Sequence, residues 1–213
     1  MTVFVGAPER WQSAAMEGTI HLVRHGEVEN PKGVIYGRLP GYHLSERGQR
    51  QARAAAQHLS DREIEAVVAS PMERAQETAE AIAEVHGLDV GTDDRFIESH
   101  STIEGLGRSA RLLLRDPRVW WHFRNPLTPS WGEPFSEIRV RMLDGVGELL
   151  QAHVGGEVVI VSHQTPVQVA RLALARRNVP PWVGLAPCST GSVTTMILEG
   201  DRLVSLEYYA PPV

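Results

Sequence analysis

Three short runs of apolar residues give the chain its basic pattern. They lie at residues 19–23, 65–69 and 157–161, and each is followed at once by polar residues. Runs of this length, rich in valine and isoleucine, are typical of strands that are buried on both faces of a parallel sheet. The pattern therefore predicts three internal strands, of which 157–161 is the clearest.

The second and third strands each lead into a helix with a recognisable start. Ser70 with Glu73, and Thr165 with Gln168, have the spacing of a capping box, in which two side chains satisfy free backbone N–H groups. A proline stands directly after the serine and the threonine, at the first helical position. We expect the second of these helices to run to about Ala175.

Other elements are predicted by the same signals. Ser45 is placed to cap a helix over 49–59, and Gly87 is suited to end the helix that follows the second strand. A further helix is expected over 136–153. Near the end of the chain, two apolar stretches separated by the Gly-Asp pair at 200–201 predict a hairpin.

The repeated unit of strand, polar turn and helix indicates an α/β fold. We expect a three-layer sandwich with a mainly parallel central sheet and helices on both faces. Residues 1–18 are expected to be an N-terminal extension and 19–213 a single domain, with 99–135 as a variable insertion or cap region. The glycine- and proline-rich stretch 28–44 predicts a long loop, and 93–98 a short extended piece.

Polar residues suited to chemistry follow the predicted strands. Arg24 and His25 follow the first strand, Arg74 lies just after the second, and His163 follows the third. In parallel sheets, ligands bind outside the carboxyl ends of the strands, so we expect these side chains to meet. We also expect Gly26 to adopt a positive φ, which would let the chain turn sharply there.

Composition narrows the classes of partner. The 213 residues are 42% hydrophobic and 22% charged, with a net charge of −5. The acidic balance argues against nucleic acid or an anionic membrane as a partner. No apolar run approaches the roughly 18 residues of a membrane span, and the N-terminus lacks the pattern of a signal peptide. With Cys188 as its single cysteine, the chain fits a reducing cytoplasm.

Two arginines and two histidines at neighbouring strand ends predict a site for a phosphate dianion. The arginine fork matches phosphate oxygens and stays charged. A neutral imidazole can attack phosphorus, and the surrounding cations can stabilise the charge on its oxygens. A carboxylic acid is then needed to protonate the leaving oxygen.

Four motifs resemble those of the histidine phosphatase superfamily, the phosphoglycerate-mutase-like fold. They are L-V-R-H-G-E at 22–27, S-P-M-E-R-A-Q-E-T-A at 70–79, D-R-F-I-E at 94–98 and V-S-H at 161–163. They occur in the order found in the family and lie within residues 19 to about 199.

The resemblance implies a role for each matching residue. His25 would be the nucleophile that becomes phosphohistidine, and Arg24, Arg74 and His163 would hold the phosphoryl group. Glu98 matches the acid/base position. The resemblance implies no metal and no organic cofactor, because the cationic side chains take the place of a metal.

The sequence departs from the family pattern at several points. Gln164 stands where the family usually has glycine after the second histidine. Asn30 lies one residue away from the usual asparagine; with Gly37 and Gln164 it is a candidate for substrate contact. Glu104 is an alternative acid. The E-R-H-Y-G signature of phosphoglycerate mutases is absent, since 99–105 reads S-H-S-T-I-E-G.

The first hypothesis is therefore a phosphomonoester hydrolase of the phosphatase branch, acting on a small phosphorylated metabolite. Two alternatives stay open: a phosphoglycerate-type mutase that uses the same phosphohistidine, and a non-catalytic protein that binds a phosphorylated ligand. Arg38 and His43 are either substrate contacts or solvated loop residues. The remaining histidines show no metal-ligand spacing. The sequence does not name the substrate and leaves the oligomeric state open, a homo-oligomer included.

Overall fold

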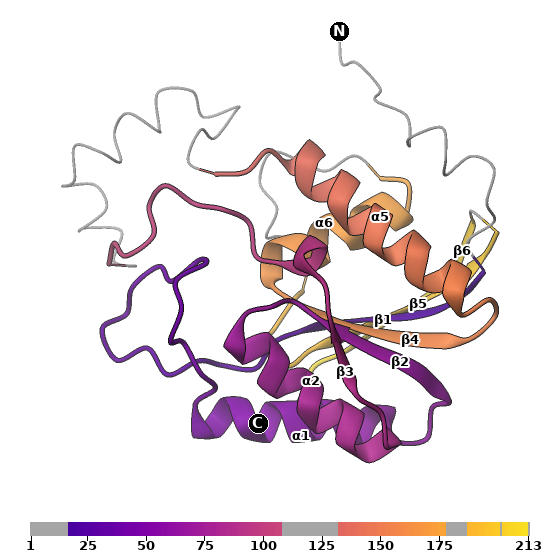
Figure 1. Ribbon diagram of the computed structural model, residues 1–213, viewed down its shortest axis with the longest axis horizontal. Coiled ribbons are helices and arrows are strands. Elements are labelled where there is room, and N and C mark those ends of the chain that lie inside the picture. Colours follow the sequence, from indigo (N-terminus) through magenta and orange to yellow (C-terminus); the bar gives the residue numbers. More distant parts are fainter. Residues whose placement is uncertain (1–16, 108–131, 178–186, 201, 213) are drawn as a thin grey trace, which may run out of the picture.

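The computed structural model describes residues 17–107, 132–177, 187–200 and 202–212. Within them the chain forms a six-stranded sheet of order β3-β2-β4-β1-β5-β6 (Figure 1). The strands are β1 (Gly18–Arg24), β2 (Ile64–Ala69), β3 (Val90–Thr92), β4 (Glu157–Ser162), β5 (Val193–Glu199) and β6 (Arg202–Tyr209).

The strand pairing places the carboxyl ends of the parallel strands, among them β1, β2 and β4, at the same end of the sheet. β1, β4, β2 and β3 are parallel neighbours, whereas β5 and β6 form an antiparallel hairpin beside β1. Arg24 at the end of β1 lies opposite Ser162 of β4, and Ala69 of β2 lies opposite Val161. The turns that follow these strands therefore begin at the same level, which is the arrangement the sequence predicts.

Helices cover both faces of the sheet. In Figure 1, α1 (Glu46–Leu59) and α2 (Glu73–His86) lie below it, and α5 (Phe135–Ala152) and α6 (Gln164–Leu174) lie above it. The predicted three-layer α/β sandwich with a mainly parallel sheet is confirmed.

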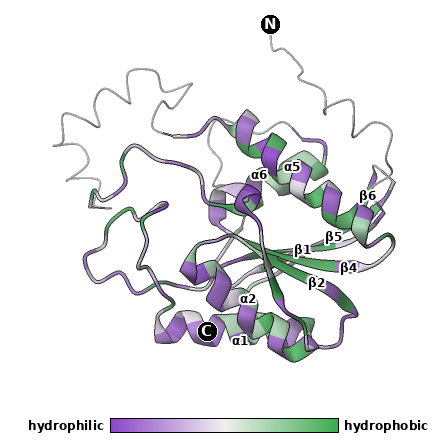
Figure 2. Ribbon diagram, viewed as in Figure 1, coloured by the Kyte–Doolittle hydropathy of each residue, from purple (hydrophilic) through white to green (hydrophobic). Residues whose placement is uncertain are grey.

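The central strand β4 shows why its sequence is apolar throughout. Val158 and Ile160 pack in one cluster with α5 and α6, and Val159 and Val161 pack in another with α1 and α2. All four side chains have no exposed surface. The strands are hydrophobic along most of their length in Figure 2, while the helices are mixed. Because both faces of β4 are buried, its residues do not alternate between hydrophobic and polar as those of a half-exposed strand do.

Two predicted helix ends are confirmed. The Ser45 hydroxyl accepts a hydrogen bond from the Gly48 N–H at 3.1 Å and caps α1, which begins at Glu46. Gly87 ends α2 in the left-handed region, with φ of 65°. A glycine adopts this conformation without the steric cost that a Cβ would bring.

Both predicted capping boxes are wrong. α2 begins at Glu73 without a side-chain cap, and the Ser70 hydroxyl lies 2.8 Å from Nε2 of His163 instead. α6 begins at Gln164, so Thr165 lies inside its first turn. Each helix starts directly from the strand-end turn, and Ser70 forms a long-range contact where the spacing predicted a local one.

The segment 93–98 is not the predicted extended piece. It contains the 3₁₀ helix η2 (Asp94–Phe96), and the Asp93 carboxylate caps this turn by accepting a hydrogen bond from the Arg95 N–H at 2.8 Å. An aspartate before a polar turn favours such a cap.

Gly26 also differs from expectation, because it does not adopt a positive φ. A Cβ at this position would lie 2.5 Å from the backbone oxygen of Gly48 at the start of α1. The Gly26 N–H donates to the Thr78 hydroxyl of α2 at 3.1 Å. Glycine is required here for close approach between the strand end and α1.

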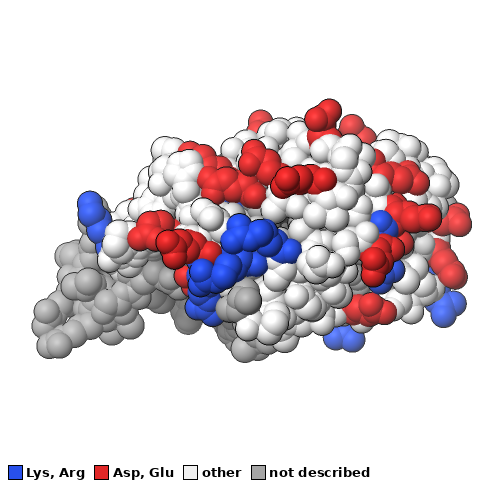
Figure 3. All heavy atoms as spheres, turned by 90° about the horizontal axis from the view of Figure 1, so that it is seen from below, with Lys and Arg blue, Asp and Glu red and all other residues white. Residues whose placement is uncertain are grey.

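Several predictions fall outside the described residues. These are most of the N-terminal extension, residues 1–16, and the central part of the cap region at 108–131. β1 begins at Gly18, one residue before the predicted strand 19–23. Among the described helices, none is long and apolar enough to cross a membrane. The face in Figure 3 carries acidic side chains across most of its width and one compact basic group.

Candidate active site

Four predicted side chains are brought together at the carboxyl edge of the sheet. Arg24 is the last residue of β1, and the next residue, His25, still donates its N–H to Ser162 of β4 at 3.0 Å. Arg74 comes from the first turn of α2, and His163 lies between β4 and α6. Each is therefore placed by a buried strand and the turn that follows it.

His25 is a buried, neutral histidine. Its side chain is 1% exposed, and Nδ1 lies 2.7 Å from the backbone oxygen of Gly26. A carbonyl only accepts hydrogen bonds, so Nδ1 carries the proton and the lone pair remains on Nε2. Burial, then the positive charges of Arg74 and Arg24, lower the pKa of His25 well below its ordinary value of 6.5. The ring is therefore neutral at pH 7.

His163 lies beside His25 with its ring turned edge-on. The ring centroids are 5.0 Å apart at an interplanar angle of 61°. Nε2 of His163 pairs with the Ser70 hydroxyl, while Nδ1 is buried and has no hydrogen-bond partner among the described residues. Burial, His25 and nearby arginines lower the pKa of His163 well below 6.5. An incoming anion would favour the protonated ring, in which both nitrogens donate.

Arg74 is fully buried, yet most of its donors are unused. Nη2 donates to the backbone oxygen of Gly37 at 2.7 Å, whereas Nε and Nη1 have no hydrogen-bond partner among the described residues. The guanidinium carbon lies 4.9 Å from the ring centroid of Tyr36. Burial lowers the pKa of Arg74, against the opposing effects of Tyr36 and nearby carboxylates.

Arg24 resembles Arg74 in that one nitrogen bonds a backbone oxygen and another has no partner among the described residues. Nη1 donates to the backbone oxygen of Cys188 at 2.6 Å, and Nε is buried without a hydrogen-bond partner among the described residues. Unsatisfied buried donors are rare in folded proteins and costly to maintain. The unpaired nitrogens of Arg24, Arg74 and His163 lie around the imidazole of His25, an arrangement that is chemically suited to an anion.

Tyr36 and Tyr42 are neighbours of this site that the sequence reasoning missed. Their rings stack with centroids 5.1 Å apart, and Tyr36 meets the ring of His25 edge-on at 6.4 Å. Both residues belong to the predicted loop 28–44. The available signal in the sequence was that Tyr36 directly precedes Gly37, a candidate for substrate contact. In the structure the Gly37 carbonyl bonds Arg74, which brings Tyr36 to the site.

The two candidate acids have different surroundings. The Glu98 carboxylate accepts from the Ser99 N–H at 2.8 Å and from the Ser99 hydroxyl at 3.2 Å. Burial raises the pKa of Glu98 above its ordinary value, against the opposing effects of the Ser99 hydrogen bonds and of Arg74 and Arg24. Glu104 instead accepts from the backbone N–H of Arg38 at 3.1 Å.

The three weaker candidates lie around the site in different ways. Gly37 holds Arg74 through its carbonyl, with φ of 42°. The Asn30 amide is used within the loop, donating to the Val34 oxygen at 2.9 Å and accepting from the Val34 N–H at 3.1 Å. Gln164 is the partly buried first residue of α6. Among the described residues there is no group of three histidine, cysteine or acidic side chains that could hold a metal ion.

Most of the chain is similar to known proteins. The family model of the histidine phosphatase superfamily (branch 1) matches residues 20–210. An uncharacterised protein of Mycobacterium tuberculosis is 50% identical over 199 residues, which cover 92% of this chain and 97% of that protein. Phosphoserine phosphatase 1 of Hydrogenobacter thermophilus is 32% identical over 190 residues, covering 87% and 89% of the two chains.

A mutase is also among the relatives. The 2,3-bisphosphoglycerate-dependent phosphoglycerate mutase of Thermoplasma acidophilum is 40% identical over 189 residues, covering 87% of this chain and 90% of the mutase. Among solved structures, YhfR of Bacillus stearothermophilus superposes with a TM-score of 0.74 at 27% identity, covering 87% and 94% of the two chains. The chain belongs to the histidine phosphatase superfamily (branch 1), whose phosphatase and mutase members share this fold.

Proposed function

We propose that the protein hydrolyses phosphate monoesters of small metabolites through a phosphohistidine at His25. One observation carries the proposal: buried nitrogens of Arg24, Arg74 and His163 lie around the neutral ring of His25 and have no hydrogen-bond partners among the described residues. A phosphate dianion supplies the acceptors and the negative charge that these groups lack.

The first chemical step follows from the protonation of His25. Its Nε2 lone pair attacks phosphorus, and a P–N bond forms as the P–O bond to the leaving group breaks. The arginines and His163 stabilise the charge on the phosphoryl oxygens, as preorganised donors do in other phosphoryl transfers. His25 keeps its Nδ1–H bonded to the Gly26 carbonyl, so the imidazole does not need to turn.

Glu98 is proposed as the acid/base group. Its raised pKa favours the protonated form that a leaving alkoxide needs, and Arg74 and Arg24 are close enough to affect its charge. After giving its proton to the leaving oxygen, the Glu98 carboxylate takes a proton from the water that attacks the phosphohistidine. Inorganic phosphate leaves and His25 is regenerated. Glu104 is the weaker candidate because its carboxylate joins two separate segments through the backbone N–H groups of Arg38 and Ser101, whereas the Glu98 carboxylate bonds to the adjacent Ser99.

A phosphoglycerate mutase is the second candidate, since one relative bears that name. It would return the phosphoryl group of His25 to substrate instead of passing it to water. The absence of E-R-H-Y-G at 99–105 favours the hydrolase. A non-catalytic phospho-ligand binding protein is the third, and the intact set of Arg24, Arg74, His163 and His25 argues against it.

The test is a set of assays on purified protein. Phosphoserine, 3-phosphoglycerate and p-nitrophenyl phosphate are each supplied, and both inorganic phosphate and isomerised phosphoglycerate are measured, with His25→Gln as the inactive control. The proposal predicts phosphate release that requires His25. Isomerisation of phosphoglycerate faster than its hydrolysis would favour the mutase, and tight ester binding without turnover would favour the binding protein.

A further inference from the structure

The backbone that carries Glu98 is held from outside the active site by two arginines. Arg38 of the 28–44 loop donates from Nε to the backbone carbonyl oxygen of Glu98 at 2.7 Å. Arg141 of α5 donates from Nη1 to the Arg95 oxygen at 2.5 Å. The two bonds bracket the short segment 95–98 at its first and last residues, so this segment is fixed by parts of the chain distant in sequence.

Between these two points the segment is pinned to the sheet. The Ser162 hydroxyl at the end of β4 donates to the Phe96 oxygen at 2.6 Å. The Phe96 side chain is fully buried in the core beside α5. Three of the four carbonyls in 95–98 therefore accept hydrogen bonds from side chains, which is an unusually high share for a segment without regular secondary structure beyond η2.

Glu133 joins the two arginines. Its Oε2 lies 2.9 Å from Nη2 of Arg38. Arg141 donates to both carboxylate oxygens, from Nε to Oε1 at 2.7 Å and from Nη2 to Oε2 at 3.1 Å. The exposed fractions of the Glu133 and Arg141 side chains are only 13% and 16%. A paired, partly buried carboxylate of this kind orients its partners more firmly than an exposed ion pair.

The backbone of Glu133 is tied to the same region. Its N–H donates to the His100 oxygen at 3.0 Å, two residues after Glu98. A Cβ on the preceding Gly132 would lie 2.5 Å from that same oxygen. The close approach requires glycine at 132 and fixes Glu133 beside the acid segment.

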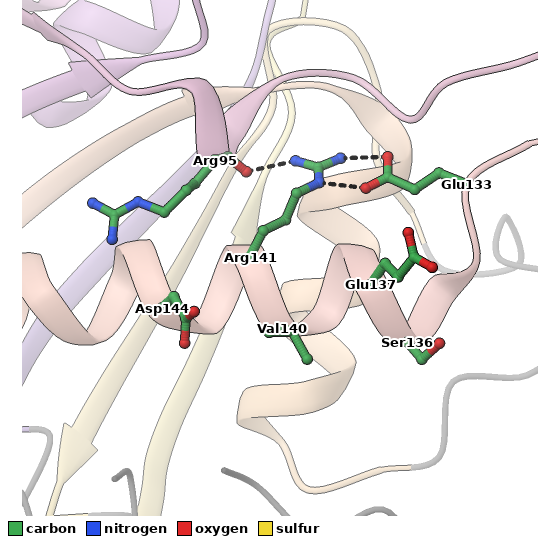
Figure 4. A pocket seen from close by; sticks show the side chains of 7 residues that line it. All are labelled: Arg95, Glu133, Ser136, Glu137, Val140, Arg141 and Asp144. Atoms are coloured by element: carbon green, nitrogen blue, oxygen red, sulfur yellow. Dashed lines mark hydrogen bonds and ion pairs between the residues drawn. The ribbon is translucent and has the colours of Figure 1, made fainter.

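Figure 4 shows Glu133, Arg141 and Arg95 along one side of a cavity of about 530 Å³ on the outer surface of α5. Glu137, one turn before Arg141 on α5, lines the same cavity. No bond joins its carboxylate to the arginines drawn in Figure 4. Glu137 is exposed, so it offers a matched control for removing a carboxylate from this surface.

We infer that Glu133 is a positioning residue for proton transfer: by joining Arg38 to Arg141 it holds the segment that presents Glu98 to the leaving oxygen. This inference rests on the proposed hydrolase function. Arg38 is accordingly a structural clamp on Glu98, where the sequence left it as either a substrate contact or a solvated loop residue.

The leaving group of the substrate separates positioning of the acid from general support of the fold. An alkoxide leaves only when it is protonated, whereas p-nitrophenolate leaves with little help. General acid catalysis contributes about 10²–10⁴-fold, so partial misplacement of the acid in Glu133→Gln should lower kcat/KM for phosphoserine by about 10- to 100-fold. The value for p-nitrophenyl phosphate should change by less than about threefold, because phosphoryl binding and attack do not need the proton.

The same assays are made on Glu137→Gln, Arg38→Gln and the double variant Arg38→Gln/Glu133→Gln. Glu137→Gln should match wild type on both substrates. The double variant should lose no more than the worse single variant, because both substitutions break one connected path. Equal losses on the two substrates, or additive losses in the double variant, would overturn the positioning role.

Amide hydrogen exchange of the segment 93–104, measured without substrate, separates this inference from the proposed function. Exchange should be faster in Glu133→Gln than in wild type and unchanged in Glu137→Gln. Unchanged exchange in Glu133→Gln overturns the inference whatever the activity. Faster exchange in a protein whose wild type hydrolyses neither ester supports the link to the segment and refutes only the hydrolase.

Discussion

Replacing Arg74 by lysine tests the phosphate site at its most buried member. Lysine keeps one positive charge and three donors, but all three leave a single nitrogen, so they cannot reproduce the planar fork that bonds the Gly37 carbonyl and presents Nε and Nη1 elsewhere. Two guanidinium nitrogens, Nε and Nη1, are free of hydrogen bonds to the described residues, and we expect them to bind phosphoryl oxygens.

The size of the effect follows from those two donors. A hydrogen bond to a charged group contributes about 1.5–3 kcal/mol, so losing one or two of them in the transition state costs about 1.5–6 kcal/mol. At 1.36 kcal/mol per factor of ten, Arg74→Lys should lower kcat/KM by between about 10-fold and about 10⁴-fold. The free energy of unfolding should change by less than about 1.5 kcal/mol, because the lost bond to Gly37 is offset by removal of buried unpaired donors.

The assay is phosphate release from p-nitrophenyl phosphate together with thermal unfolding. Arg53→Lys is the control, since Arg53 is exposed on α1 and the same substitution there should leave both quantities unchanged. A kcat/KM for Arg74→Lys within about fivefold of wild type would refute the assignment of Arg74 as a two-donor phosphate ligand.

Three further predictions test other parts of the account. Because burial lowers the pKa of His25 and His163 in the folded protein, the unfolded chain binds more protons below pH 6.5, and the free energy of unfolding should fall as the pH decreases from 6.5. Each ring contributes up to about 1.4 kcal/mol per pH unit, so urea titrations of His25→Gln should show a shallower pH slope than wild type, and an equal slope would contradict the neutral ring. Gly26→Ala should lower the free energy of unfolding by about 1–3 kcal/mol, because its Cβ would overlap the Gly48 oxygen, and urea unfolding measures this. Glu98→Gln should lower kcat/KM for phosphoserine by about 10²-fold or more while sparing p-nitrophenyl phosphate; equal loss on both esters would point to another acid.

The sequence predicts where Arg24, His25, Arg74 and His163 lie in the fold, for a local reason. Arg24 and His25 follow a buried strand directly, and Arg74 and His163 come just after two others. Once the apolar runs are recognised as parallel strands, the chain itself carries these residues to one edge of the sheet. No contact between distant side chains has to be guessed.

Contacts between distant residues are what the sequence could not supply. The spacing of Ser70 and Glu73 is that of a capping box, but the hydroxyl pairs with His163, 93 residues later. The same limit applies to Glu133, which bonds Arg38 across 95 residues. A hydroxyl or carboxylate has several partners available to it, and only the folded chain selects among them.

The prediction that Gly26 adopts a positive φ is wrong for a different reason. Glycine has two physical uses, a positive φ and a close backbone approach. The sequence favours the first, because the chain turns directly after the strand. The structure selects the second, because the Gly26 backbone packs against the start of α1.

The central claim is that the phosphoryl group passes through His25. It is tested most directly by mixing wild-type protein with a phosphate monoester, quenching within milliseconds in alkali, which preserves phosphohistidine, and locating the modified residue by peptide mass spectrometry. The account predicts a phosphoryl group on the peptide containing His25, absent in His25→Gln. Phosphate release by wild-type protein with no phosphorylated peptide, or with the group on His163, would contradict it.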